Sequence, residues 1–543
     1  MNSQDPFTAQ WSIEDLLRPD AFPHEVSALQ LRQTHISWVI LTGSFAYKIK
    51  KPVKLDFIDA STLEQRRHYC EEEVRLNRRT APDLYIDVVA ITLQHGRALI
   101  GGHGIAVEYA VRMRQFSPMD ELPALLAKQA VAAEEMAALG ELIAAFHRDA
   151  PHAPTMRAPE KTEQIHRAVF DNLQQLLDMA APADPEERMN HLAAWTRDTA
   201  HELAATFQQR EREGFIREGH GDLHAANIVR HEQRLVPFDC IEFDPRMRWI
   251  DVIDDISFLV MDLMSYGRAD LATTLLSRYL EVTGDYDGMQ LLPFYATHRA
   301  LVRAKVDALT ARSVPARAAE CRDRMEQRLV AAMTWTTPQR HPFLILMHGA
   351  SGSGKSWLSD RLVPELPALR IRSDLERKRL AHLGPTQSAA AGVREGIYSP
   401  RFSERTYERL AHCAERCLLT GFSVIVDASF LDGAHRETFQ ALAARLGVPR
   451  LIVSCESDPI AASAHLLERS ARGTDASDAT LAVLDAQLRE FKPFPPSERA
   501  DVIEVDARAP HAVQHVRQEI RSRLAEGITS AHPLNRRLPW PRQ

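Results

Sequence analysis

The fold of the C-terminal part of the chain is decided by Phe343-Leu344-Ile345-Leu346-Met347-His348, which runs directly into Gly349-Ala350-Ser351-Gly352-Ser353-Gly354-Lys355-Ser356. A run of apolar residues predicts a buried strand, and a Gly-rich octapeptide between a strand and a helix predicts a phosphate-binding loop. The glycines allow main-chain N–H groups to surround phosphates, and the N-terminus of the next helix adds a favourable dipole. Lys355 is expected to bridge the β- and γ-phosphates of a nucleotide, and the Ser356 hydroxyl to bind Mg²⁺.

Residues 343–530 are predicted to form a doubly wound α/β domain. Apolar strands are expected at 343–348, 369–372, 423–426, 451–454 and 502–505, with helices between them. This alternation indicates a mostly parallel sheet with helices on both faces. The composition changes at 336–342, which we interpret as an interdomain linker, and residues 531–543 form an irregular tail.

Two acidic residues follow strands of this predicted sheet. Asp374 comes after the second strand, and Arg377 lies one helical turn further. A carboxylate there can accept the proton of an attacking hydroxyl, and an arginine can hold substrate or phosphate. Asp427 ends the third strand and can act on Mg²⁺ through water. The alternative is a capping role, in which Ser373 or Asp374 starts a helix and Asp427 caps a turn.

A pair of arginines, Arg469 and Arg472, lies in a helical region after the fourth strand. Residues three apart share one face of a helix. Both side chains can therefore close over bound phosphates as a lid and neutralise charge in the transition state. The alternative is a solvated surface pair.

On these residues, the segment 342–525 resembles the P-loop kinases that include polynucleotide kinase, chloramphenicol phosphotransferase and zeta toxins. Asp374 and Arg377 have the spacing of the catalytic Asp-x-x-Arg of the polynucleotide kinase branch, and Ser477-Asp478-Ala479 is similar to the same group. The resemblance implies an ATP- and Mg²⁺-dependent phosphoryl transfer. It leaves the acceptor open, because the family acts on nucleic-acid ends, sugars and antibiotics.

A second motif lies in Gly219-His220-Gly221-Asp222-Leu223-His224-Ala225-Ala226-Asn227-Ile228, which contains H-x-D-x-x-x-x-N. This is the spacing of a protein-kinase-type catalytic loop. Asp222 is expected to accept a hydroxyl proton and Asn227 to bind Mg²⁺, and Asp239, at the end of a following strand, is a second metal ligand. Zinc binding by the two histidines is disfavoured because no third ligand is spaced near them. The remaining alternative is an ordinary polar loop.

A kinase-type site also needs a strand lysine for the α- and β-phosphates and a helix glutamate to orient it. Lys48 or Lys50, on one face of a predicted strand, can supply the lysine, and Glu71, Glu72 or Glu73 the glutamate. We favour Lys48 with Glu73. The alternative is a basic strand edge beside an acidic helix.

With these pieces, residues 30–310 resemble the aminoglycoside phosphotransferase family. The resemblance implies a two-lobed, protein-kinase-like domain over residues 1–335, with an N-lobe at about 30–115 and a C-lobe at about 120–335. Glu108, Tyr109 and Ala110 are then the hinge strand that meets adenine.

The chain departs from this family in two places. The Gly-rich nucleotide loop is reduced to Gly43-Ser44, so the resemblance does not extend to the contacts that this loop makes with nucleotide phosphates. Asp239 is followed by Cys240-Ile241-Glu242 rather than by Phe-Gly, so Glu242 is an alternative metal ligand. Phe146-His147 matches the central C-lobe helix.

The secondary structure expected for the N-terminal part is mixed. We predict a helical lead-in over 1–30, strands within 35–58, a helix at 62–79, two strands within 84–114 that turn near 101–102, helices over 125–215, a β-rich stretch at 216–244 and helices over 250–335.

Composition limits the partners and the compartment. A net charge of −7 over 543 residues gives no general drive toward nucleic acid or anionic membranes. The six cysteines include no CxxC pair, which favours a reducing compartment. The N-terminus lacks a signal-peptide pattern, and no segment reaches membrane-spanning length. We therefore expect a cytoplasmic protein that does not insert into membranes.

Three functional hypotheses follow. The first is a bifunctional enzyme with two Mg²⁺·ATP sites, which transfers phosphoryl groups to a small molecule, sugar or nucleoside. The second makes the C-terminal domain a nucleic-acid 5′-hydroxyl kinase with a channel lined by arginines. The third makes the N-terminal domain a degenerate switch that regulates the other. Candidate channel residues are Arg394, Arg401, Arg405 and Arg409.

Overall fold

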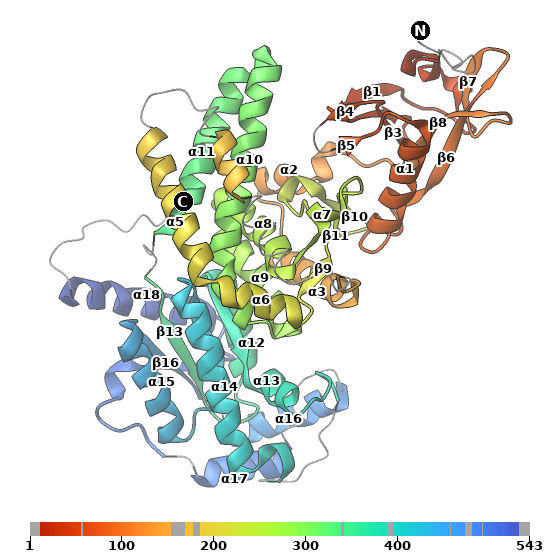
Figure 1. Ribbon diagram of the computed structural model, residues 1–543. Coiled ribbons are helices and arrows are strands. Elements are labelled where there is room, and N and C mark those ends of the chain that lie inside the picture. The colour runs from red at the N-terminus through yellow and green to blue at the C-terminus, as the bar shows by residue number, and fades with distance from the viewer. Residues whose placement is uncertain are drawn as a thin grey trace. The chain divides into compact units, whose positions relative to one another are not determined.

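The chain forms two compact units (Figure 1). The computed structural model describes residues 11–55, 58–153, 169–176, 185–337, 341–387, 395–456, 458–472, 480–490 and 492–531. The first unit contains the residues up to Asp262 together with His298–Met325, and the second contains Leu263–Thr297 together with the residues from Glu326 onward.

The N-terminal part of the first unit is an antiparallel sheet with strand order β1-β2-β3-β8-β6-β7. Successive residues of a strand face opposite sides. Tyr47 and Ile49 therefore pack on one face with η1 and η2, while Ala46 and Val111 pack on the other with α1. The elements are η1 (Ile13–Leu16), η2 (Pro19–Ala21), β1 (Gln30–Gln33), β2 (Ser37–Leu41), β3 (Phe45–Lys50), β4 (Lys54–Leu55), β5 (Ile58–Asp59), α1 (Leu63–Asn77), β6 (Tyr85–Gln94), β7 (Arg97–Ile100) and β8 (Ala106–Arg114).

The sheet differs from the predicted strands in two places. The segment 84–114 holds three strands rather than two, because the chain already turns at His95-Gly96, where both residues have positive φ, 50° and 75°. A two-residue hairpin turn with this backbone matches the twist of the flanking strands. The described part of the lead-in contains the short 3₁₀ helices η1 and η2. The strand β1, which begins at the last residue of the lead-in, was not predicted, because its polar sequence carries no alternating apolar signal.

The rest of the first unit is mainly helical, as expected, and the β-rich stretch is present as a hairpin of β10 with β11 and a pairing of β9 with β12. The elements that begin in this unit are η3 (Pro118–Asp120), α2 (Leu122–Ala127), α3 (Ala133–Asp149), α5 (Pro185–Glu202), α6 (Ala204–Arg212), β9 (Ile216–Glu218), η4 (Ala225–Asn227), β10 (Ile228–His231), β11 (Arg234–Pro237), α7 (Pro245–Arg248), β12 (Trp249–Asp251), α8 (Val252–Ser265), η6 (Pro315–Arg317) and α11 (Ala318–Thr336).

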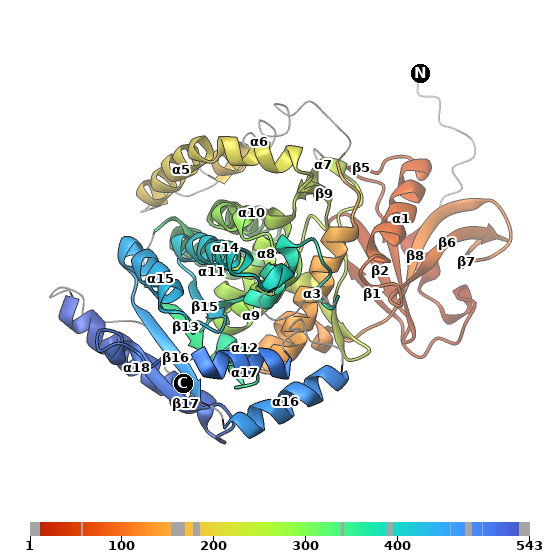
Figure 2. The same cartoon turned by 90° about the horizontal axis from the view of Figure 1, so that it is seen from below.

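The second unit is built on a parallel sheet with strand order β14-β15-β13-β16-β17. The predicted parallel sheet is confirmed, with α12 and α18 on one face and α14 and α15 on the other (Figure 2). The elements that begin in this unit are α9 (Ala269–Thr283), η5 (Asp287–Leu291), α10 (Leu292–Ser313), β13 (Leu344–His348), α12 (Lys355–Glu365), β14 (Ala368–Arg372), α13 (Ser373–Leu380), η7 (Gly396–Tyr398), α14 (Pro400–Leu419), β15 (Ser423–Asp427), α15 (Gly433–Leu446), β16 (Arg450–Glu456), α16 (Pro459–Arg472), α17 (Leu481–Glu490), η8 (Arg499–Asp501), β17 (Val502–Asp506) and α18 (Ala512–Ala531).

Helix α9 belongs to the second unit although it precedes β13 by about sixty residues of chain. It covers the edge strand β14, where the Ser277 hydroxyl accepts a hydrogen bond from the Arg370 N–H at 2.9 Å. The Arg370 guanidinium donates to both carboxylate oxygens of Glu281, at 2.7 and 3.2 Å. The unit is therefore discontinuous in sequence, unlike the segment 343–530 that composition alone delimits.

Among the described residues, no helix has both the length and the hydrophobicity needed to cross a bilayer.

We predict that Glu281→Ala destabilises the second unit by about 3 kcal/mol, because it leaves the guanidinium of Arg370 buried without its principal partner. Chemical denaturation of the full chain, followed by fluorescence of the second unit's tryptophans, measures the change. Glu415→Ala is the matched control, since Glu415 pairs with the exposed Arg445, and its midpoint should stay that of the unaltered protein. Equal midpoints for all three proteins would contradict this account of the edge strand.

Candidate functional sites

The Gly-rich loop of the second unit connects β13 to α12. Gly352 has φ of +82°, and a Cβ there would lie 2.5 Å from the Ala462 carbonyl oxygen, so only glycine fits. The Lys355 ammonium folds back over the loop and donates to the Ala350 carbonyl at 2.7 Å. The loop thus has the backbone and the lysine position of a phosphate cradle at a helix N-terminus.

The predicted acids lie at the carboxyl ends of β15, which neighbours β13, and of β14, the next strand along the sheet. Asp427 ends β15, is buried, and accepts a hydrogen bond from the Ser359 hydroxyl of α12 at 3.2 Å. Asp374 lies in the first turn of α13, directly after β14. Ligands of open α/β sheets bind at this edge. A serine hydroxyl at Ser356 and a carboxylate at Asp427 are hard oxygen donors of the kind that Mg²⁺ prefers.

Arg377 is held by the segment that follows it. Its guanidinium donates to the Ile397 carbonyl at 2.6 Å and to the Ser403 hydroxyl at 3.2 Å, and it lies over the Tyr398 ring. These contacts were not predicted, and they give Arg377 a positioning role for this segment. Arg469 and Arg472 belong to α16, but their side chains, like Ser477-Asp478-Ala479, lie outside the described residues.

A cluster next to the loop carries no sequence motif. The Tyr407 hydroxyl lies 3.2 Å from the Ser429 hydroxyl and accepts from the Phe430 N–H, and its ring stacks on His435 with 3.6 Å between centroids. The Ser429 carbonyl in turn accepts from the Gly349 N–H. Burial raises the pKa of Tyr407, so the hydroxyl stays a hydrogen-bond donor at neutral pH.

A glutamine side chain contacts the phosphate cradle from α17. Gln487 Oε1 accepts a hydrogen bond from the Ser351 N–H at 2.7 Å. Main-chain N–H groups of this loop are the donors that nucleotide phosphates use in P-loop proteins. Gln487 therefore occupies a donor that bound phosphate can use, and no spacing in the sequence points to it.

The first unit brings Lys48, Glu73 and Asp239 together. The Lys48 ammonium donates to Glu73 Oε1 at 2.7 Å and to Asp239 Oδ1. Burial opposes the charge, but the neighbouring carboxylates, Asp239 and Glu73 first, hold the pKa of Lys48 well above its usual value. The neighbouring Lys50 is fully buried and pairs with Glu73 and Glu242. Glu242 is thus engaged with Lys50, which leaves Asp239 as the carboxylate beside Lys48.

The catalytic-loop residues also meet. Asn227 Nδ2 donates to Asp222 Oδ2 at 3.0 Å, and the His224 ring lies 3.3 Å from the same oxygen. Burial opposes the charge of Asp222, but His224 and then His220 outweigh it and hold its pKa well below the usual range. Asp222 is therefore an anion at neutral pH, and the amide and carboxylate oxygens of Asn227 and Asp239 fit Mg²⁺.

The loop backbone is fixed from beneath by Asp255, which accepts from the His220 and Gly221 N–H groups at 2.6 and 3.1 Å. His147, which the sequence placed on the central helix, lies 3.1 Å from the same carboxylate. The His220 ring contacts the Phe238 carbonyl and accepts from the Asp222 N–H. Both ring nitrogens of His220 thus have protein partners.

The residues predicted to form the hinge are part of the antiparallel sheet. Glu108, Tyr109 and Ala110 lie inside β8, where Ala110 pairs with β3 on one side and with β6 on the other. The Glu108 carboxylate is buried and accepts a hydrogen bond from Arg66 Nε at 2.7 Å, and burial raises the pKa of Glu108 to about 6. Ala110 is paired on both edges, which leaves it few main-chain groups for adenine, whereas Glu108 and Tyr109 pair with β6 alone. Adenine binding by this strand stays a prediction. β8 ends only at Arg114.

The turn at Gly43-Ser44 is as short as the sequence suggested. Thr42 and Phe45 close it through a main-chain hydrogen bond of 2.9 Å, and Gln115 Oε1 accepts from the Gly43 N–H at 2.8 Å. A Cβ on Gly43 would lie 1.9 Å from the Ser27 hydroxyl oxygen. This turn is therefore packed against its own lobe.

The fold and the Gly-rich loop of the second unit define a P-loop nucleotide-binding domain. A family model described as an AAA domain matches residues 344–494, which contain the loop, Asp374 and Asp427.

Relatives extend over both units. The uncharacterized protein Mb2027c of Mycobacterium bovis and the uncharacterized proteins MT2060 and Rv2004c of Mycobacterium tuberculosis are each 30% identical to this chain over 469 residues, which is 85% of this chain and 91% of each relative. The chain belongs to the family of these mycobacterial proteins.

Solved structures with detectable similarity include a choline/ethanolamine kinase family protein from Mesorhizobium loti and a gluconokinase from Sinorhizobium meliloti. The first is 14% identical with a TM-score of 0.32, over 57% of this chain and 93% of its own. The second is 19% identical with a TM-score of 0.25, over 36% of this chain and 100% of its own. Both TM-scores are below 0.5, so neither similarity establishes the reaction.

We predict that Gln487→Ala raises the affinity of the second unit for Mg²⁺·ATP about fivefold, because phosphate no longer has to displace a hydrogen bond of about 1 kcal/mol. Titration calorimetry with a non-hydrolysable ATP analogue measures the change. Gln440→Ala, on the exposed face of α15, is the control and should bind as the unaltered chain does. Unchanged or weaker binding in Gln487→Ala would show that the amide helps to hold the nucleotide instead.

Proposed function

We propose that the second unit is a Mg²⁺·ATP-dependent kinase that transfers the γ-phosphoryl group to a hydroxyl. The observation that carries the proposal is the meeting of the Gly-rich loop, Asp374 and Asp427 at one edge of the parallel sheet. A loop alone fits an ATPase or a switch equally well. Asp374, in the first turn of α13 directly after β14, adds at the same edge of the sheet a carboxylate that can act as a base for a hydroxyl acceptor.

Each residue has a defined part in this reaction. Asp374 takes the proton of the acceptor hydroxyl while the hydroxyl oxygen bonds to the γ-phosphorus. The bond between the γ-phosphorus and the β-phosphate oxygen of the leaving ADP breaks. Lys355 and the loop N–H groups stabilise the charge that passes to ADP. Ser356 and Asp427 would hold Mg²⁺, which would supply positive charge to the phosphates during the transfer. Arg469 and Arg472 close over the phosphates as a lid.

The same proposal gives the first unit a second phosphotransferase site. The support is the arrangement of Lys48 with Glu73, for the α- and β-phosphates, and of Asp222 with Asn227 and Asp239, for proton transfer and Mg²⁺. Lys48 contacts Asp239 directly, so phosphate and metal would have to separate this pair on binding. A small molecule, sugar or nucleoside is the acceptor that we favour at both sites.

An alternative function has specific support. The Gly43-Ser44 turn is too short to cover phosphates, which favours a regulatory first unit beside a nucleic-acid 5′-hydroxyl kinase. Against the nucleic-acid acceptor, Arg409 of the supposed channel is held by Glu376 and Asp287. Arg401 and Arg405 are exposed, and Arg394 lies outside the described residues.

We predict that Asp374→Asn lowers phosphoryl transfer by the second unit at least about a hundredfold, the usual contribution of a general base, while nucleotide affinity stays within about twofold. Labelled ATP with a panel of sugars, nucleosides, other hydroxyl metabolites and 5′-hydroxyl oligonucleotides measures transfer. Asp432→Asn, which alters the exposed cap of α15, is the control. Transfer confined to oligonucleotides would support the alternative acceptor, and full activity in Asp374→Asn would remove Asp374 as the base.

For the first unit, we predict that Lys48→Met abolishes nucleotide binding at one of two sites, because the phosphates lose their buried cation. Calorimetric stoichiometry of a non-hydrolysable ATP analogue should fall from two per chain to one. Lys54→Met, whose ammonium is exposed and pairs with Asp59, should keep two. A stoichiometry of one in the unaltered chain would favour the degenerate first unit.

A further inference from the structure

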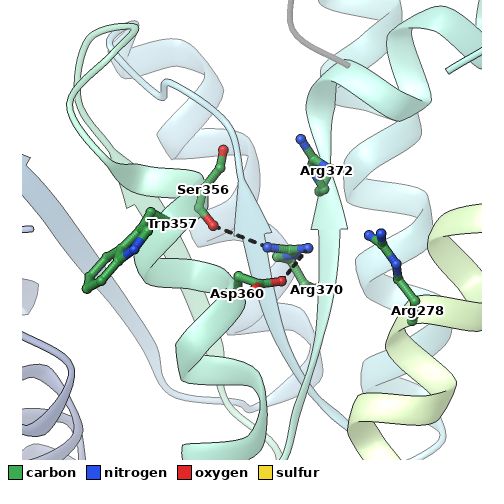
Figure 3. A pocket seen from close by; sticks show the side chains of 6 residues that line it. All are labelled: Arg278, Ser356, Trp357, Asp360, Arg370 and Arg372. Carbon is green, nitrogen blue, oxygen red and sulfur yellow. Dashed lines mark hydrogen bonds and ion pairs between the residues drawn. The ribbon is translucent and has the colours of Figure 1, made fainter. Parts of the chain in front are cut away.

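A cavity of about 300 Å³ lies in the second unit beside the start of α12, on the side of the edge strand β14. Three of its lining residues, Arg278, Arg370 and Arg372, are arginines, and only Asp360 is acidic (Figure 3). Ser356 and Trp357 complete the wall. Three guanidinium groups around one small space attract anions. None of the motifs in the sequence accounts for this cluster.

Arg370 lines the buried side of the cavity, and its side chain is taken up by contacts that stabilise the fold. Its guanidinium is buried and donates to Glu281, to the Asp360 carboxylate at 2.9 Å and to the Ser356 carbonyl at 3.2 Å. These contacts hold α9, β14 and the first turn of α12 together. Arg370 therefore sets the positions of Arg278, on α9, and Arg372, on β14, relative to Ser356.

Arg372 stands next to the position proposed for Mg²⁺. It pairs in register with Asp427 on the adjacent parallel strand, and residues in register on neighbouring strands project from the same face of a sheet. Figure 3 shows its side chain between Ser356 and Arg278. An anion bound at Arg372 therefore lies beside the site of phosphoryl transfer.

Arg278 comes from α9, outside the segment that the family model matches. Its Nη1 donates to Glu281 at 2.9 Å, and its side chain is 35% exposed and borders the cavity. Glu281 thus anchors Arg278 and Arg370 together. The inserted helix supplies this unit with a cation that a domain of residues 343–530 alone would lack.

We propose that Arg278 and Arg372 bind a doubly charged tetrahedral oxyanion, a phosphate or sulfate group, that the acceptor of the second unit carries in addition to its hydroxyl. Guanidinium groups match such oxyanions through paired N–H donors. The Asp360 carboxylate on the same wall pairs with Arg370 at 2.9 Å, so the lining keeps the positive charge of Arg278 and Arg372. The inference rests on the proposed kinase function, and it narrows the acceptor from hydroxyl compounds in general to those with a phosphate or sulfate ester.

The test uses the full chain saturated with Mg²⁺ and a non-hydrolysable ATP analogue, so that nucleotide phosphates already fill the Gly-rich loop. Inorganic phosphate, sulfate and acetate are then titrated by calorimetry. We expect phosphate and sulfate to bind more tightly than acetate, and we expect Arg278→Gln and Arg372→Gln each to weaken phosphate binding about tenfold, the loss of one charge-assisted contact. Arg445→Gln is the matched control, since Arg445 also pairs with one glutamate.

The outcomes separate the two proposals. If the ATP analogue does not bind, the result contradicts the proposed kinase function and, with it, the oxyanion site. If the analogue binds but phosphate does not, or if acetate binds as tightly as phosphate, only the oxyanion site is overturned. Unchanged phosphate affinity in both variants also overturns it. Thermal unfolding of each variant establishes that a loss of binding is not a loss of fold, since Arg278→Gln leaves the Glu281–Arg370 pair in place.

Discussion

The second unit depends on the buried ion pair of Arg370 with Glu281. An arginine at the edge of a sheet would ordinarily extend into water, but here α9 covers it, and an unpaired buried charge costs several kcal/mol. Glu281 offsets that cost with two hydrogen bonds, and the Ser356 carbonyl takes a third. The start of the helix that follows the Gly-rich loop is thereby joined to a helix from an earlier part of the chain. The placement of α9 against β14 and the arrangement of the arginine-lined cavity depend on this contact.

The first unit also stabilises buried cations with carboxylates, but here the cations are two lysines of one strand. Two lysines on one face of β3 meet carboxylates from α1 and from the segment after β11, so that each buried cation has acidic partners. Lys50 is the inner, structural member of this group, and Lys48 reaches Asp239. Only Lys48 is placed to exchange a carboxylate for a phosphate without leaving a fully buried charge unpaired.

The predictions that the structure confirms rest on patterns of neighbouring residues in the sequence. Apolar runs and their spacing located the five parallel strands because strand burial depends on consecutive side chains, and a Gly-rich loop must follow its strand directly. The sequence could not show which edges of β8 are paired, because a strand that is paired on one edge has the same sequence pattern as a strand that is paired on both. The turn at His95-Gly96 was missed because only one glycine marks it. Tyr407, Gln487 and Arg278 carry no motif, since each acts through a partner far away in the chain.

The sequence by itself located the Gly-rich loop after β13 and the acids that follow β14 and β15, and it predicted a kinase-type loop at 219–228, because each of these features is a short, contiguous pattern. Only the tertiary structure decided that Lys48 rather than Lys50 faces Asp239, that Arg377 holds its own following segment, and that α9 belongs with the parallel sheet. These outcomes depend on which buried charges find partners across long stretches of chain. The free energy of burying a charge is settled by the folded environment, and no local pattern records it.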